Sequence, residues 1–145
     1  ILGFSDGANI AMKFAMQHPE MVKALILDAG NLDPSGVKRT AQFPIEIGYK
    51  IACRFAARSP GAKKNAEMLG LMVNDPNIRP SELAKLTMPT LVVCGAKDMI
   101  RESHTRMIAE SIPNARLVIL PGDHFVANRH PAEFNQVVDD FLNSV

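Results

Sequence analysis

Three short runs of apolar residues constrain the fold of this chain more than any other feature of its sequence. The runs are Val22–Leu27, Thr90–Cys94 and Arg116–Leu120. They are rich in Val, Ile and Leu and show no alternation with polar residues, which is typical of parallel strands buried on both faces of a sheet. Segments of helical periodicity alternate with them, namely Ala8–His18, Glu102–Ile112 and a last helix that begins at Pro131. The sequence therefore predicts an α/β fold with right-handed crossovers.

A long insertion separates the first of these predicted strands from the second. It runs from about residue 31 to residue 88, and prolines divide it into short helical pieces, as in a lid. We therefore expect a first core segment (1–30), a helical lid insertion (31–88) and a second core segment (89–145). One lid helix carries a basic stripe, Lys50, Arg54 and Arg58, which we interpret as a solvated outer face.

The composition narrows the classes of partner. The formal net charge is only +1, so no net field favours nucleic acid or an anionic membrane, and neither partner is predicted. The longest uninterrupted apolar runs have four residues, whereas a membrane-spanning helix needs about 20. Cys53 and Cys94 lie 41 positions apart and Cys94 is in an apolar run, which suits a buried thiol in a reducing compartment. We therefore expect a cytoplasmic location.

The segment Gly3–Gly7 fits the pattern G-x-S-x-G, with the apolar stub Ile1-Leu2 before it and a predicted helix directly after it. A strand, a tight turn with a serine and a helix together form a nucleophile elbow, in which flanking glycines let strand and helix pass closely. The helix N-terminus favours developing negative charge, and the backbone amide of Asp6 is placed to donate to an oxyanion. The alternative is a plain loop between strand and helix.

A serine nucleophile needs a base, and the base needs an orienting acid. Asp98 follows the predicted strand Thr90–Cys94, and His124 follows Arg116–Leu120, so both are expected at the carboxyl edge of the sheet. The chain order Ser5, Asp98, His124 is the order of the triad on this kind of sheet. Asp28 also follows a strand and is an alternative acid, but the Gly-x-x-Asp turn before a helix favours Asp98.

The other histidines and possible metal ligands are interpreted more simply. His18 is expected to cap the end of a helix, and His104 and His130 are expected on the surface. No Cys-x-x-Cys or His-x-x-x-His pattern occurs, so we expect no metal and no cofactor.

These motifs resemble the carboxyl-terminal part of an α/β-hydrolase-fold protein, from the nucleophile elbow onward. The resemblance rests on Gly-Phe-Ser-Asp-Gly around Ser5, Cys-Gly-Ala-Lys-Asp before Met99, Pro-Gly-Asp-His-Phe around His124, and the segments His18-Pro19-Glu20 and His130–Phe134. It covers nearly the whole chain. The Ser-Asp-Gly form of the elbow is more loosely similar to lidded, valacyclovir-hydrolase-like enzymes.

The resemblance implies a truncated α/β-hydrolase fold, with sheet strands six to eight, flanking helices and a helical lid. The second oxyanion amide of the family comes from a loop after the third strand, which lies outside this sequence. We therefore expect the chain to be a fragment that lacks the amino-terminal half. Alone it should be inactive or nearly so, with an uncovered sheet edge through which copies can associate.

Two functions remain open at this point. The first is a serine hydrolase that cleaves a small-molecule ester, thioester or amide by acyl transfer; the second is a non-catalytic α/β-hydrolase-like binding or interaction protein. The complete order of nucleophile, acid and base favours the hydrolase. Apolar side chains predict a pocket for a small or medium acyl or alcohol group, although the lid residues among them could instead form the lid core; the candidates are Phe4, Ile51, Phe55, Met72 and Phe125.

The side chain of Asp6 has two interpretations. It is a helix-start residue that complements the helix dipole and never meets substrate, or it turns into the pocket and contacts a substrate ammonium group. The resemblance to valacyclovir-hydrolase-like enzymes implies that such a substrate would be an aminoacyl ester. A basic stripe facing the pocket would favour anionic substrates instead.

Overall fold

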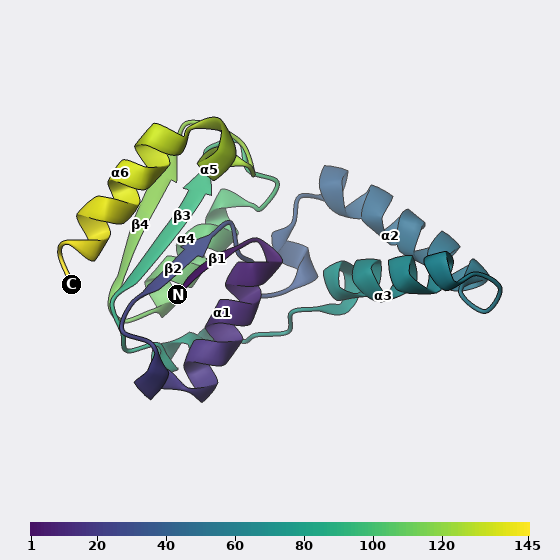
Figure 1. Cartoon of the computed structure of the whole chain (residues 1–145), viewed down its shortest axis with the longest axis horizontal. Helices are drawn as coiled ribbons and strands as arrows, with labels where there is room; N and C mark the ends of the chain where they lie inside the picture. Colours follow the sequence, from purple (N-terminus) through teal and green to yellow (C-terminus); the bar gives the residue numbers. More distant parts are fainter.

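The computed structural model describes residues 1–145 and contains one parallel sheet of four strands in the order β1-β2-β3-β4 (Figure 1). Its strands are β1 (Leu2–Phe4), β2 (Leu25–Asp28), β3 (Thr90–Gly95) and β4 (Ala115–Leu120). The predicted α/β fold and parallel sheet are confirmed, although β2 begins three residues later than the apolar run does. The stub at the amino terminus is β1, which pairs with β2 in the register Leu2 to Ile26.

Alternate residues of the strands face two separate apolar clusters, because successive strand side chains point to opposite faces. On one face, Leu25, Leu27 and Val92 pack with helices α1 (Asp6–Gln17) and α4 (Glu102–Ser111). On the other face, Ile26, Leu91 and Val93 pack with helices α5 (Val126–Arg129) and α6 (Pro131–Leu142). Covering both faces explains why β2 and β3 are apolar at nearly every position.

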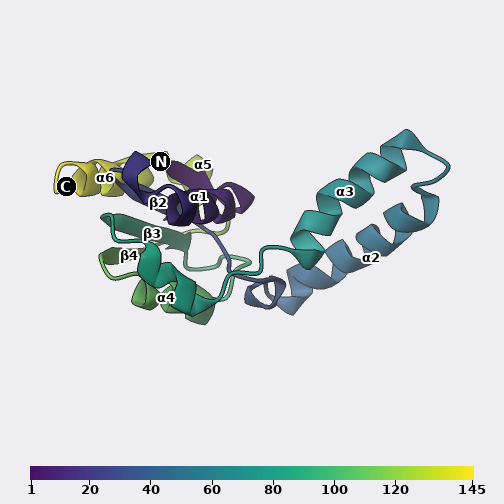
Figure 2. The same cartoon turned by 90° about the horizontal axis from the view of Figure 1, so that it is seen from below.

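Two long helices form a hairpin that projects away from the sheet (Figure 2). They are α2 (Arg39–Phe55) and α3 (Pro60–Asn74), which pack on each other along their length. Ser59 caps α3 by accepting a hydrogen bond from the N–H of Ala62, and Pro60 occupies the first helical position.

The projecting hairpin is shorter than the 31–88 insertion expected from the sequence. Leu32, Ile78, Leu83 and Leu86 lie outside the hairpin and belong to the cluster under α1. Three short 3-10 helices also lie outside the hairpin. The helix η1 (Pro19–Met21) follows α1, whereas η2 (Pro34–Gly36) lies before the hairpin and η3 (Pro80–Lys85) lies after it. Both ends of the insertion therefore contribute to the core that supports the sheet.

His104 is not on the surface, as expected from the sequence, but buried on the inner face of α4. Its Nε2 accepts a hydrogen bond of 2.9 Å from the N–H of Leu32. Burial lowers the pKa of this imidazole, which keeps the ring neutral and able to accept. The spacing of His104 and Ile108, one helical turn apart and both buried, is the pattern that would have revealed it.

The two cysteines differ in their surroundings. Both are free, Cys53 exposed on α2 and Cys94 buried in β3. Burial, followed by the charge of Asp98, raises the pKa of the Cys94 thiol to about 11. No helix in the structure combines the length and the apolar character needed to cross a bilayer.

Candidate active site

Ser5 lies in the tight turn between β1 and α1. Its φ is 53° and its ψ is −120°, a left-handed conformation that is rare for a residue with a side chain. Its N–H donates to the carbonyl oxygen of Asp28 at 2.8 Å, which holds the turn against β2. A Cβ atom at Gly3 would lie 2.3 Å from the carbonyl oxygen of Gly7, so strand and helix can approach this closely only with glycine at Gly3.

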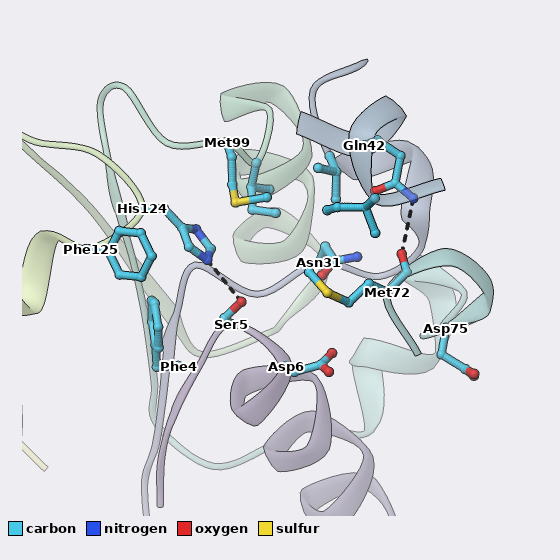
Figure 3. A pocket seen from close by; sticks show the side chains of 13 residues that line it. Phe4, Ser5, Asp6, Asn31, Gln42, Met72, Asp75, Met99, His124 and Phe125 are labelled. Atoms are coloured by element: carbon cyan, nitrogen blue, oxygen red, sulfur yellow. Dashed lines mark hydrogen bonds between the residues drawn. The ribbon is translucent and has the colours of Figure 1, made fainter. Parts of the chain in front are cut away.

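The structure brings Ser5, His124 and Asp98 together into one hydrogen-bonded chain. The Nε2 of His124 lies 3.0 Å from the Oγ of Ser5 (Figure 3). Its Nδ1 lies 2.8 Å from Oδ1 of Asp98. Asp98 is 2% exposed and His124 is 8% exposed. The three side chains come from loops after β1, β3 and β4, at the same edge of the sheet.

Close backbone contacts hold the two loops that carry the acid and the imidazole. A Cβ atom at Gly95 would lie 2.2 Å from the carbonyl oxygen of Asp123, so the end of β3 touches the loop before His124. Gly122 has a φ of +139°, which favours glycine and turns that loop over the sheet edge. The N–H of Ile100 donates to Oδ1 of Asp98 at 2.8 Å and fixes the carboxylate.

Two aromatic rings flank the imidazole of His124. The ring centroid of Phe4 lies 5.1 Å from that of His124, and Phe125 meets the imidazole edge to face at 5.5 Å. These contacts limit the orientations open to the ring and shield it from water. Lys38 lies nearby and its Nζ donates to the backbone carbonyl of Asp98 at 2.5 Å.

Asp28, the alternative acid, lies close by but makes no hydrogen bond to the imidazole. It is 1% exposed, and neither of its carboxylate oxygens has a hydrogen-bond partner. Burial raises its pKa to about 7, the charge of Asp98 adds to the rise, and the charge of His124 opposes it. Asp98 is therefore the acid that contacts the imidazole. Asp28 is a second buried acid, and its raised pKa favours the neutral form.

A cavity of about 360 Å³ opens beside the Oγ of Ser5 (Figure 3). Three of the five predicted substrate-binding residues line it, namely Phe4, Met72 and Phe125. Ile51 and Phe55 do not, because they lie on the outer part of α2 and line a separate hollow between α2 and α3. The hairpin places only its end nearest the sheet over Ser5, so residues further along α2 lie beyond the cavity.

Several lining residues were missed by the sequence reasoning. They are Asn31, Val37, Gln42, Ile45, Asp75, Met99 and Ile100. The positions of Met99 and Ile100, directly after Asp98, could have revealed these two. Gln42 and Asp75 come from α2 and from the residue after α3, and no sequence pattern connects them.

Asp6 lines the cavity at the start of α1. Its Oδ1 accepts a hydrogen bond of 3.2 Å from Nδ2 of Asn9, one turn along the helix. Its backbone amide is in the first helical turn, where amides have no acceptor within the helix. The basic stripe Lys50, Arg54 and Arg58 is exposed and takes no part in the cavity lining.

A parallel sheet flanked by helices, with a serine at a strand-to-helix turn, is the architecture of an α/β hydrolase. The chain belongs to the serine hydrolase (FSH1) family, whose model matches residues 1–135. No curated protein sequence matches the chain.

Solved structures share the fold. A meta-cleavage product hydrolase from Pseudomonas fluorescens matches with a TM-score of 0.75 and 19% identity, over 99% of this chain and 64% of that protein. An enol-lactonase from Burkholderia xenovorans matches with a TM-score of 0.71 and 18% identity, over 98% of this chain and 64% of that protein. A hydrolase from Pseudomonas aeruginosa matches with a TM-score of 0.68 and 26% identity, over 97% and 63%. The chain thus spans less than two thirds of the length of each.

Proposed function

We propose that the whole protein is a serine hydrolase that cleaves an ester, thioester or amide of a small molecule by acyl transfer. The hydrogen-bonded chain from Ser5 Oγ through His124 to Asp98 carries this proposal. Membership of a serine hydrolase family supports it. In this proposal Ser5 is the nucleophile, His124 the general base and Asp98 the orienting acid.

The reaction then proceeds in two halves. His124 takes the proton of Ser5 as Oγ attacks the substrate carbonyl, and the backbone amide of Asp6 donates to the oxyanion of the tetrahedral intermediate. His124 returns the proton to the leaving group, and the acyl group stays on Oγ. Water, deprotonated by His124, then attacks the acyl-enzyme, which releases the acid and restores the hydroxyl of Ser5. Asp98 stabilises the imidazolium in both halves.

In this proposal the second oxyanion donor lies outside residues 1–145, in the part of the fold that the longer structural relatives contain. One amide alone forms a weak oxyanion hole, since losing one donor lowers turnover by about 10²–10³ in a comparable site. Residues 1–145 by themselves are then a fragment that is nearly inactive.

The lining of the cavity supports a small or medium apolar acyl or alcohol group as the part of the substrate next to Ser5. Phe4 and Phe125 both contact the imidazole and also lie 6.0 Å from each other, and Met72 covers the cavity from the lid. Methionine and phenylalanine side chains form adaptable apolar walls. We also propose a cytoplasmic location, which two free cysteines support.

The test uses the full-length protein with a p-nitrophenyl ester and a serine-directed fluorophosphonate probe. Ser5→Ala and His124→Ala should each lower ester turnover by about 10³-fold or more, and Ser5→Ala should abolish labelling. Ser81→Ala, at an exposed serine in η3, is the matched control and should leave both signals unchanged. Near wild-type turnover by Ser5→Ala would refute the nucleophile and favour a non-catalytic binding protein with this fold.

A further inference from the structure

Gln42 extends from α2 of the lid into the wall of the cavity that contains Ser5. The side chain is 5% exposed. Its Nε2 donates a hydrogen bond of 3.2 Å to the backbone carbonyl oxygen of Met72 on α3. A carbonyl oxygen can only accept, so this bond fixes which end of the amide faces Met72. The oxygen of Gln42 therefore points away from Met72 (Figure 3).

That oxygen, Oε1 of Gln42, is buried and has no hydrogen-bond partner in the protein. Buried polar atoms in folded proteins nearly always have a partner, so an acceptor left free in the wall of a cavity indicates a ligand that supplies the donor. Val37 and Ile45, which line the same wall, are apolar and cannot supply it.

None of the other polar side chains on this side of the cavity donates a hydrogen bond to Oε1 of Gln42. Asn31 uses both ends of its amide within the protein, since its Nδ2 donates to the carbonyl of Asp33 and its Oδ1 accepts from Asn9. Asp75 lines the cavity with a carboxylate, which accepts when ionised. No Lys or Arg lines the cavity. The lid side therefore offers acceptors to a substrate and favours one that carries donors.

We propose that Oε1 of Gln42 is a specificity site that accepts a hydrogen bond from a hydroxyl or N–H group of the substrate, at a position remote from the bond that is cleaved. This inference rests on the proposed hydrolase function and names its substrate class. The substrate is an ester, thioester or amide whose acyl or alcohol chain bears a hydroxyl or N–H donor. A substrate without the donor leaves the acceptor unpaired in a dry site, and sites of this kind reject such analogues.

Two pairs of esters test the proposal with the full-length protein. One pair places the donor on the acyl side: p-nitrophenyl hexanoate and its ω-hydroxy analogue. The other pair places it on the alcohol side: hexyl acetate and its ω-hydroxy analogue. We expect wild-type kcat/KM to be about tenfold or more higher for the hydroxylated member of one pair, and the pair that responds identifies the side of the substrate that Gln42 meets.

Three variants separate recognition by Oε1 from the lid contact that Nε2 makes. Gln42→Met keeps the length of the side chain but has no such acceptor, and the preference should fall to about one. Gln42→Glu also loses the donor to Met72 but keeps an acceptor, so the preference should survive. Tyr49→Phe removes another contact between the lid helices, the 3.4 Å bond from Asn74, outside the cavity, and should leave the preference unchanged.

The outcomes distinguish failure of the role proposed for Gln42 from failure of the proposed hydrolase function. Turnover of all four esters with no preference in wild type, or with the same preference in Gln42→Met, would overturn the role of Gln42 and leave the hydrolase intact. A preference lost equally in Gln42→Glu and Gln42→Met would show that the lid contact matters and the acceptor does not. No turnover of any ester, together with no fluorophosphonate labelling of Ser5, would overturn the proposed function and this inference with it.

Discussion

One oxygen of Asp98 binds both His124 and its own loop: Oδ1 lies 2.8 Å from Nδ1 of the imidazole and accepts the N–H of Ile100 at 2.8 Å. The backbone contact fixes the carboxylate, and the carboxylate in turn fixes the ring. Asp28 ends the neighbouring strand and lies opposite Val93, before β3 turns toward Asp98. The side chain of Asp28 is buried and makes no hydrogen bond.

The two acids should therefore respond differently to the same substitution. Asp98→Asn should lower kcat by about 10⁴-fold, because an amide favours the wrong tautomer of the imidazole. Asp28→Asn should change kcat by less than about tenfold, since Asp28 makes no hydrogen bond to the ring. Ester hydrolysis by the full-length variants measures both. A larger loss in Asp28→Asn than in Asp98→Asn would exchange the two roles.

Asp28 should make stability depend on pH. Its pKa is about 7 in the folded chain against 3.8 as the reference, so between these values the folded state binds more protons than the unfolded state. Stability then falls as pH rises from about 4 to about 7, by at most about 4 kcal/mol, and levels off above that range. Asp28→Asn removes the titrating group and should flatten this part of the profile. Urea unfolding at several pH values measures it, and an equal slope in wild type and variant would contradict the assignment.

The charge of Asp6 should appear in the substrate preference if its side chain meets the substrate. An aminoacyl ester would then be turned over faster than its des-amino analogue, because the ammonium group gains a charge-assisted contact. Asp6→Asn should reduce that preference by about tenfold. Asn9→Ala, which removes the hydrogen bond to Oδ1 of Asp6 and keeps the carboxylate, is the companion variant. Equal turnover of both esters, unchanged in Asp6→Asn, would leave Asp6 as a helix-start residue.

The free edge of β1 should make the isolated 145-residue polypeptide associate. In this structure β1 pairs with β2 alone, and the side chains of Ile1, Leu2 and Phe4 are exposed there. Unpaired strand edges with apolar side chains favour association. Size-exclusion chromatography with fluorophosphonate labelling should show species larger than a monomer and weak labelling of Ser5. A monomer that labels fully would show that the site is complete without further residues.

Local sequence was sufficient for the strands and for the three residues of the hydrogen-bonded chain. The apolar runs at β2 and β3 are buried on both faces, which leaves no polar alternation in them. The expectation of full burial is wrong for β4, which is an edge strand in which only Leu120 is buried. Ser5, Asp98 and His124 each follow a strand, and parallel strands bring such residues to one edge of the sheet. A continuous apolar run and a position directly after it can both be seen in the sequence itself.

The position of the α2–α3 hairpin relative to the cavity could not be predicted from its sequence. Apolar residues at helical spacing along α2 predict an apolar face, but Ile45 lines the cavity beside Ser5, whereas Ile51 and Phe55 line a hollow between α2 and α3. Whether a lid residue reaches the cavity depends on where the hairpin leaves the sheet. That position is set by contacts such as the packing of Leu32 and Leu83 under α1. These two residues lie far apart in the chain.

The sequence by itself determined which residue types could perform acyl transfer and the order in which the strands deliver them, because both follow from local periodicity and turn chemistry. Only the tertiary structure left Asp28 buried without a hydrogen-bond partner, carried Ile51 and Phe55 away from the cavity and revealed the unpaired oxygen of Gln42. Each of these depends on distances between atoms that are remote in the chain. Such distances are set by the packing of the whole core and leave no pattern in neighbouring residues.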